Sequence, residues 1–171
     1  MLVIYSKLVV SDRDHRWIEG LRQAHDPQHH MVGAHFTFVF PFAGTPVDDA
    51  IGHAECVSKA TAPIQFQLTK AAVVKDAVGP ATHLFLLPTV GAEQMRELHV
   101  RLYAGVLASH LNSKLSFSPH VTVGAFEQEA DAANVARGLG GVSIPGALAG
   151  LFVAEFDGCA VKDLCEISFA S

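Results

Sequence analysis

Apolar runs and amphipathic segments alternate along the chain, and each predicts a strand or a helix. Residues 2–10 are apolar and rich in β-forming side chains, which predicts a buried strand. A helix is expected over 14–25, and the turn at Asp26-Pro27 ends it because proline disfavours helix at the residue before it. The next strand is expected over 35–42. The first quarter of the chain is therefore predicted as strand, helix, strand.

A second helix has the clearest local start signal in the chain. Thr45 is a capping residue, Pro46 fits the first helical position, and Asp48 stands three residues after Thr45, which predicts a capping box. This helix is expected to end near Ala60. The remaining elements are strands over 64–76 and 82–87 around a Gly79-Pro80 turn, a long helix over 92–111, a strand over 120–126, a helix over 129–139 and a hairpin of 148–156 with 164–169.

This order of elements predicts the fold class. Strands that follow one another as hairpins, interleaved with helices, favour an α+β fold over a doubly wound parallel sheet. In each half of the chain a helix precedes a strand that begins with histidine, which indicates two related lobes. No Ser-rich or Pro-rich linker interrupts the sequence, so residues 1–171 are expected to form a single bilobal domain.

Composition limits the classes of protein that this sequence can be. With 171 residues, 50% hydrophobic and 17% charged, the chain can bury a sizeable core, which excludes wholesale disorder. A net charge of −5 argues against a general nucleic-acid coat or a polybasic membrane binder. Residues 127–171 hold seven acidic and two basic residues, whereas residues 1–126 hold ten of each. An anionic substrate is therefore expected to be received by local geometry and not by a strong overall field.

Cysteine usage and the N-terminal segment predict the compartment. The three cysteines form no CxxC pair, so no thiolate zinc site is expected. The N-terminal segment lacks a basic region ahead of its apolar run, which does not fit a signal peptide. No apolar stretch approaches the ~18 residues that a membrane span needs. A cytoplasmic protein without a membrane partner is predicted.

Two of the predicted strands carry the same polar pair. The first begins at His35 with Thr37 two residues later, and the second begins at His120 with Thr122 two residues later. Because strand side chains alternate between faces, the histidine and threonine of each strand share one face and the apolar residues occupy the other. Each strand is thus expected to carry a histidine–threonine pair on one face and to be anchored by the apolar residues on its other face.

This arrangement suits phosphoryl transfer by an acid–base pair. Histidine titrates near neutral pH, so one imidazole can take a proton from the attacking group while the other donates one to the leaving oxygen. A threonine hydroxyl about 7 Å further along the same face can donate to a phosphate oxygen. Such a site requires no metal and no cofactor.

With these motifs the sequence resembles the two-histidine (2H) phosphoesterases, in their bacterial 2'-5' RNA ligase-like branch. The resemblance rests on HFTFVFPF at 35–42, FSPHVTVGAF at 117–126 and the preceding RQAHDPQ at 22–28. It implies a pseudo-symmetric fold in which two mainly antiparallel sheets face each other across a central cleft, with helices packed outside.

The resemblance also implies the roles of the motif residues. His35 and His120 correspond to the family's catalytic histidines, and Thr37 and Thr122 to its phosphate-binding hydroxyls. Members cleave 2',3'-cyclic or related phosphodiesters, or catalyse the reverse ligation of RNA ends. The expected function is metal-independent hydrolysis of a 2',3'-cyclic phosphate, with reverse 2'-5' RNA ligation as a second activity. The assignment of acid and base to the two histidines stays open.

One departure from the family bears on the substrate. Many members have a basic residue directly after the position of Gly124, where this chain has Ala125. This favours a small cyclic nucleotide or an RNA terminus with a cyclic phosphate over a long RNA, and DNA is not expected as a partner. Lys70, Lys75 and Arg101 are further candidates for phosphate contact.

Two phenylalanines and a histidine cluster leave alternatives open. Phe42 and Phe126 stand at the ends of the two motif strands, where they either stack on a base or pack in the core. A non-catalytic protein that binds nucleotides or RNA ends on the same fold is the main alternative function. A metalloprotein using His25, His29 and His30 is a third, although a solvated loop explains that segment more simply.

Overall fold

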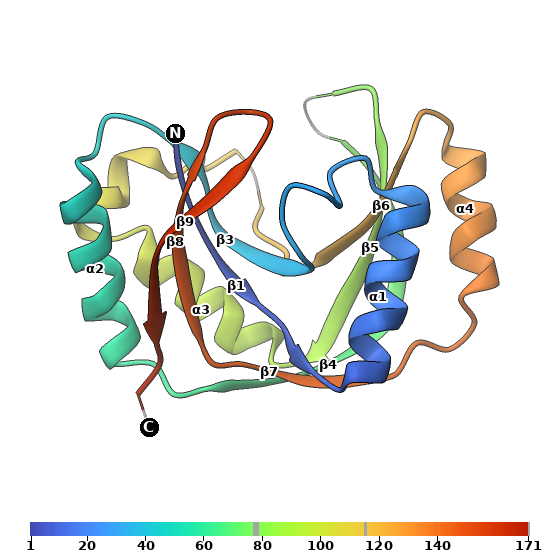
Figure 1. Cartoon of the computed structure of the whole chain (residues 1–171), viewed down its shortest axis with the longest axis horizontal. Coiled ribbons are helices and arrows are strands. Elements are labelled where there is room, and N and C mark those ends of the chain that lie inside the picture. Colours follow the sequence, from blue (N-terminus) through green and yellow to red (C-terminus); the bar gives the residue numbers. More distant parts are fainter. Residues whose placement is uncertain (77–78, 115, 171) are drawn as a thin grey trace.

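The computed structural model describes residues 1–76, 79–114 and 116–170 and contains two antiparallel sheets with helices packed outside them (Figure 1). The first sheet has the strand order β3-β1-β8-β9, formed by β1 (Leu2–Lys7), β3 (His35–Phe42), β8 (Gly150–Phe156) and β9 (Val161–Ser168). The second has the order β2-β7-β4-β5-β6, formed by β2 (Val9–Val10), β4 (Ile64–Lys75), β5 (Thr82–Val90), β6 (Val121–Phe126) and β7 (Ile144–Leu148). The predicted α+β class is confirmed.

Two of the helices pack against a strand from the other half of the chain. The first sheet is covered by α2 (Val47–Lys59) and α3 (Ala92–Leu102), and the second by α1 (Asp12–His25) and α4 (Glu129–Gly138) (Figure 1). Helix α1 precedes β3 in sequence but packs against β6, whereas α3 precedes β6 but packs against β3. Each of the two motif strands is therefore held by a helix from the other half.

The core is continuous between the two sheets. Phe36 and Phe38 of β3 are fully buried on the face opposite His35 and Thr37, as strand alternation predicts. The Phe36 ring meets the edge of Phe66 from the second sheet, with 5.4 Å between their centroids. A single apolar cluster thus joins residues of both sheets and fixes the position of β3 relative to the second sheet.

Strand β3 lies at an edge of the first sheet, and side chains of α3 and the residue after it occupy its outer side. The Nδ1 of His99 donates to the Phe38 carbonyl at 2.8 Å, and the Phe40 N–H donates to the Tyr103 hydroxyl at 3.0 Å. These bonds satisfy backbone groups that an edge strand otherwise leaves unpaired. They also fix the strand that carries the first histidine motif.

The predicted capping box is wrong. Helix α2 begins at Val47 with Pro46 at the cap position and no side-chain capping bond. The Thr45 hydroxyl is instead hydrogen-bonded to Nε2 of His110, at 2.8 Å. A capping side chain with a tertiary partner is unavailable to the helix. Capping is found instead at α1, where the Ser11 hydroxyl accepts from the Asp14 N–H.

The predicted long helix over 92–111 is shorter than expected. Helix α3 ends at Leu102, and a 3₁₀ helix, η1 (Gly105–His110), follows it after a break. Gly105 has a φ of +55°, a conformation that favours glycine and interrupts the helix. The break brings Leu107 into the core and leaves Val106 47% exposed.

Two strands of the second sheet were not predicted as such. The first apolar run divides into β1 and β2, which belong to different sheets. Strand β7, which pairs with both β2 and β4, was missed because its sequence contains Pro145 and Gly146, typical of turns. A Cβ on Gly146 would lie 2.4 Å from the Phe66 ring, so this strand needs glycine where the ring crosses it.

Candidate active site

The two motif strands face each other from the edges of their sheets. Strand β3 ends the first sheet and β6 ends the second, and the two strands are in contact (Figure 1). His35 opens β3, and His120 directly precedes β6. Both side chains are half-buried, and a charge on His120 acts on the pKa of His35. The structure thus brings together two histidines that are far apart in sequence.

Both imidazoles are held in the same way. His35 Nδ1 lies 2.8 Å from the Gly33 carbonyl oxygen, and His120 Nδ1 lies 2.7 Å from that of Ser118. A carbonyl oxygen only accepts hydrogen bonds, so the hydrogen of each neutral ring is assigned to Nδ1. Nε2 is then the nitrogen of each ring that can accept a proton in the neutral form or donate one in the charged form.

Burial sets the charge state of the two rings. Desolvation is the largest influence on both, and it lowers the pKa of His35 and of His120 below the ordinary value of 6.5. The hydrogen bonds to Gly33 and Ser118 oppose this lowering, because they favour the protonated ring. Both imidazoles therefore favour the neutral form at neutral pH, and a bound phosphate anion would favour protonation of one of them.

The two threonines lie on the same faces as their histidines, beside aromatic neighbours. Thr37 is opposite Tyr5 of β1 in the strand register, and Thr122 is opposite Phe85 of β5. Both threonines are half-buried, so their hydroxyls are not enclosed in the core.

On the side of the first sheet, a tyrosine–lysine pair borders His35. The Tyr5 ring lies edge-on to the His35 ring, at 5.2 Å between centroids. The Tyr5 hydroxyl donates to one oxygen of Asp163, and Lys7 binds the other oxygen at 2.7 Å. The Lys7 ammonium also lies over the Phe152 ring, 3.9 Å from its centroid, which stabilises the cation. Sequence reasoning missed this group, because Asp163 is far away along the chain.

On the side of the second sheet, an aromatic cavity borders His120. Its volume is about 590 Å³, and Phe40, Phe85, Tyr103, Phe117, His120 and Thr122 are among its lining residues. Phe85 stacks on His120 with 3.8 Å between centroids, and His83 stacks on Phe85 at 5.6 Å. Lys75, a candidate phosphate contact from the sequence, also lines this cavity. The cavity joins one histidine and one threonine of the predicted site to a surface suited to a flat ring.

The two phenylalanines considered for base stacking lie elsewhere. Phe42 is 5% exposed and packs in the core, with its ring 4.9 Å from that of His110. Phe126 packs on His25 of α1, at 5.5 Å between centroids. Neither lines the cavity beside His120. Phe42 is thus buried in the core and Phe126 is half-buried against it, and Phe85 is the ring next to a candidate catalytic group.

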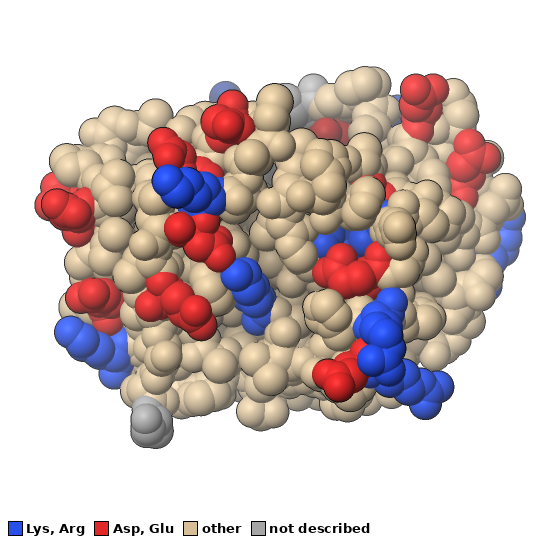
Figure 2. Space-filling view, viewed as in Figure 1, with Lys and Arg blue, Asp and Glu red and all other residues tan. Residues whose placement is uncertain are grey.

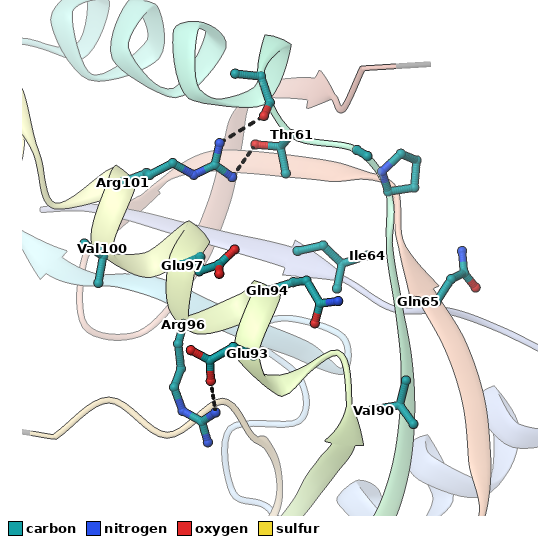
Figure 3. A pocket seen from close by; sticks show the side chains of 13 residues that line it. Thr61, Ile64, Gln65, Val90, Glu93, Gln94, Arg96, Glu97, Val100 and Arg101 are labelled. Atoms are coloured by element: carbon teal, nitrogen blue, oxygen red, sulfur yellow. Dashed lines mark hydrogen bonds and ion pairs between the residues drawn. The ribbon is translucent and has the colours of Figure 1, made fainter.

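A larger groove of about 900 Å³ lies away from both motifs, along α3 and the start of β4 (Figure 3). Its arginines are bonded within the protein: Arg96 to Glu93 at 3.0 Å, and Arg101 to the Ala60 carbonyl at 3.0 Å and the Thr61 hydroxyl at 2.9 Å. Arg101, a second candidate phosphate contact, is thus placed outside the histidine site.

The histidine cluster considered for metal binding has other contacts. His29 Nδ1 lies 3.1 Å from the Asp26 carbonyl oxygen, and His25 packs on Phe126. Within 1–76, 79–114 and 116–170, no three His, Cys, Asp or Glu side chains lie close enough together to hold a metal ion. None of the helices in the same ranges is long and apolar enough to span a membrane.

Two antiparallel sheets with a histidine–threonine strand at each facing edge define the architecture predicted from the motifs. A sequence model of the 2'-5' RNA ligase superfamily matches residues 10–158. The chain belongs to this superfamily of 2H phosphoesterases, which confirms the resemblance.

One relative and several solved structures are similar to the chain. A protein of Bacillus licheniformis, whose name assigns it provisionally to the phosphoesterases, is 26% identical over 104 residues. The match covers 60% of this chain and 58% of that protein, so it spans little more than half of the relative. The structure of TT0787 of Thermus thermophilus has a TM-score of 0.65 at 14% identity, covering 99% of this chain and 98% of the other. Escherichia coli LigT complexed with 3'-AMP has a TM-score of 0.56 at 16% identity, with the same coverage. At such identities the structures show a shared fold.

Proposed function

We propose that the protein is a metal-independent phosphodiesterase that hydrolyses a 2',3'-cyclic phosphate on a small nucleotide or RNA terminus. The observation that carries this proposal is the matched anchoring of His35 and His120, each through Nδ1 to a backbone carbonyl. Both rings keep Nε2 for proton exchange, one as base and one as acid.

In the proposed reaction, neutral Nε2 of one histidine takes a proton from a water molecule while the water oxygen forms a bond to phosphorus. Protonated Nε2 of the other histidine donates its proton to the ribose oxygen as the bond from that oxygen to phosphorus breaks. The cyclic diester becomes a phosphomonoester and a ribose hydroxyl. Thr37 and Thr122 donate hydrogen bonds to the non-bridging oxygens, where negative charge builds up.

The size and charge of the site support a small substrate. A cavity of about 590 Å³ with Phe85 and His120 in its lining has room for one nucleobase beside His120. Lysines, arginines and acids are interspersed over the face seen in Figure 2, and most of it is uncharged, unlike a surface that binds a long polyanion. LigT, which shares the fold, has been solved in complexes with 3'-AMP, NADP+ and ATP. We also propose that the protein works in the cytoplasm, where its three unpaired cysteines stay reduced.

The test is an assay of EDTA-treated protein against the four 2',3'-cyclic mononucleotides, with 2'- and 3'-phosphate products resolved. We expect a single product isomer, and a loss of at least ~100-fold in turnover in both His35→Ala and His120→Ala. His15→Ala, an exposed histidine of α1, is the matched control and should retain full turnover. Near-normal turnover in either motif variant would contradict the assignment. Tight binding of a cyclic nucleotide in calorimetry, with no product formed, would instead support the non-catalytic nucleotide binder. Formation of 2'-5' linked RNA from separate RNA ends would show the ligation activity.

A further inference from the structure

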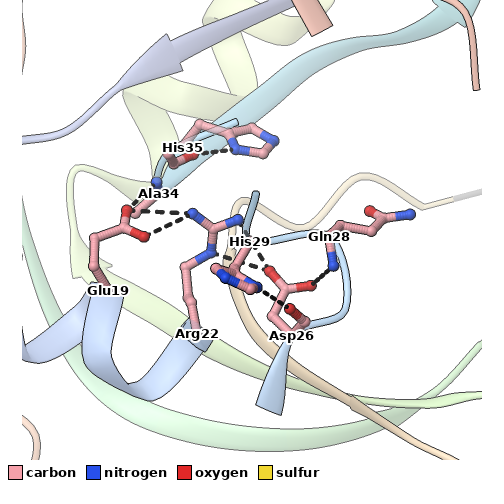
Figure 4. Close-up of polar contacts among 8 residues, drawn as sticks. Glu19, Arg22, Asp26, Gln28, His29, Ala34 and His35 are labelled. Carbon is pink, nitrogen blue, oxygen red and sulfur yellow. Dashed lines mark hydrogen bonds and ion pairs between the residues drawn. The ribbon is translucent and has the colours of Figure 1, made fainter. Parts of the chain in front are cut away.

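A buried cluster of charges lies beneath the segment that leads into His35 (Figure 4). Arg22 of α1 is 2% exposed and Asp26 is 5% exposed, and their side chains are paired at 3.0 Å. Arg22 also binds both carboxylate oxygens of Glu19, at 3.1 and 3.2 Å. Burying an arginine with two carboxylate partners costs desolvation free energy, which raises the question of what the cluster does beyond packing.

Glu19 and His35 bind opposite ends of one peptide group. The Ala34 N–H donates to Glu19 Oε1 at 2.6 Å, and His35 Nδ1 donates to the Gly33 carbonyl oxygen at 2.8 Å. This carbonyl and this N–H belong to the same peptide unit. Hydrogen bonds in such a chain polarise one another, so the carboxylate makes the carbonyl oxygen a stronger acceptor for the imidazole N–H.

We propose that Glu19 is a positioning residue for His35, which it orients and whose protonated form it stabilises through the Gly33–Ala34 peptide. The proposal rests on the function proposed above, in which His35 exchanges a proton through Nε2. Arg22 and Asp26 hold Glu19 and the following turn in place, since the Asp26 carboxylate also accepts from the Gln28 N–H at 2.9 Å.

The second histidine has no equivalent support. His120 donates to the Ser118 carbonyl, and the nitrogen of that peptide belongs to Pro119, which has no hydrogen to donate. A carboxylate therefore has no N–H to bind there. The two imidazoles are anchored alike, but within 1–76, 79–114 and 116–170 the anchoring peptide of His35 binds a carboxylate and that of His120 has no N–H to do so, which distinguishes them.

The charges around His35 give the direction of the effect. Arg22 and His120 lower the pKa of His35, and Asp26 and the bond to Gly33 raise it, against a dominant lowering by burial. From β1, Lys7 lies opposite His35 in the register and Tyr5 contacts its ring, and Asp163 of β9 binds both. Removing the charge of Glu19 weakens the acceptor at Gly33 and leaves Arg22 less compensated. Both changes disfavour the imidazolium and move the pKa of His35 further down.

The first variant is Glu19→Gln, whose side-chain oxygen still accepts from the Ala34 N–H without the charge. Titration of the histidine side chains by ¹⁵N NMR reads each ring separately. We expect the His35 midpoint to move to lower pH while that of His120 stays in place, and kcat/KM at neutral pH to fall about tenfold, the lower range for loss of an orienting partner. Glu93→Gln is the matched control, because Glu93 forms the same i,i+3 pair with Arg96 on the exposed surface of α3. It should change neither readout.

The second variant, Ala34→Pro, removes the donor N–H but keeps Glu19 and Arg22, and it copies the proline at the same position before His120. We expect the same downward shift for His35. A shift of the His35 midpoint in Glu19→Gln but not in Ala34→Pro would overturn the transmission through the peptide. If in both variants the midpoints of His35 and His120 stay in place or move by the same amount, the proposal is overturned. If far-UV circular dichroism shows one variant unfolded, the other decides. The NMR titration needs no turnover. The expected shift of His35 in a protein without phosphodiesterase activity would therefore contradict only the proposed function. Activity without that shift would contradict only this inference.

Discussion

The imidazole of His120 lies nearly flat on the ring of Phe85, with 3.8 Å between centroids and 24° between planes. Beside His35, the Tyr5 ring is not stacked but meets the imidazole edge-on, at 5.2 Å between centroids. The stacked ring covers one face of His120, which fixes the plane of the imidazole and contributes to the burial that lowers its pKa. Catalytic candidates with the same backbone anchor thus have different aromatic surroundings.

Replacing the Phe85 ring should impair the active site without unfolding the protein. We expect Phe85→Leu to lower kcat/KM by about twofold to tenfold, from the ~0.5–1.5 kcal/mol that an aromatic pair adds beyond burial. Steady-state kinetics on the best cyclic mononucleotide measures this. Phe42→Leu, which alters a ring outside the cavity, is the control for a general loss of packing. Equal losses in the two variants would show that stacking on His120 has no special role.

The two histidines should behave as one catalytic unit. If each provides one of two coupled proton transfers, the double variant His35→Ala/His120→Ala should be little slower than the slower single variant. Single-turnover rates of the three proteins test this. Losses that multiply fully would indicate that the histidines act in independent steps.

The bond from Tyr103 to β3 should contribute to stability. Tyr103→Phe removes the acceptor of the Phe40 N–H, which we expect to cost about 0.5–1.5 kcal/mol of unfolding free energy, because a part-buried backbone donor loses its partner. Urea denaturation measures the loss. Thr89→Val is the comparison, since the hydroxyl contact of Thr89 with Thr69 is exposed and water can replace it. A larger loss for Thr89→Val would contradict this view of the edge strand.

Stability should fall in mild acid. His35, His99 and His120 have pKa values lowered chiefly by burial, below the ordinary 6.5 of the unfolded chain. The unfolded state therefore binds more protons, and the stability present above that value is lost as pH falls through 6.5 toward the folded-state values. We expect a lower urea midpoint at about pH 5.5 than at about pH 7.5. His99→Asn should reduce the difference, and an unchanged difference in that variant would remove His99 from the explanation.

Two glycines should respond oppositely to the same substitution. A Cβ on Gly124 of β6 would lie 2.7 Å from the Phe126 ring and 3.1 Å from the Cβ of His25, so Gly124→Ala should destabilise by about 1–3 kcal/mol, the cost of overpacking. Gly52 of α2 is exposed with open space around it, so Gly52→Ala should stabilise by about 0.5–1 kcal/mol through helix propensity. Thermal unfolding of both variants checks the signs. Destabilisation by Gly52→Ala would contradict the open space at that position.

The sequence by itself determined what depends on neighbours along the chain. Strand alternation placed His35 with Thr37 on one face and Phe36 with Phe38 in the core, and the repeated motif indicated two related halves. The α+β class and the family were predicted from the same residues and confirmed. These features are local because the period of a strand and the identity of a motif need no knowledge of what packs against them.

Only the tertiary structure decided which distant groups meet at the site. The crossing of α1 onto β6 and α3 onto β3 is a property of the whole chain, and so are the approach of Asp163 to Tyr5, of Phe85 to His120, and of Glu19 to Ala34. Strand β7 and the early end of α3 were missed for the same reason. Pro145, Gly146 and Gly105 have local preferences that the sequence reveals, but burial of Phe66 and Leu107 against other elements decides how those preferences are used.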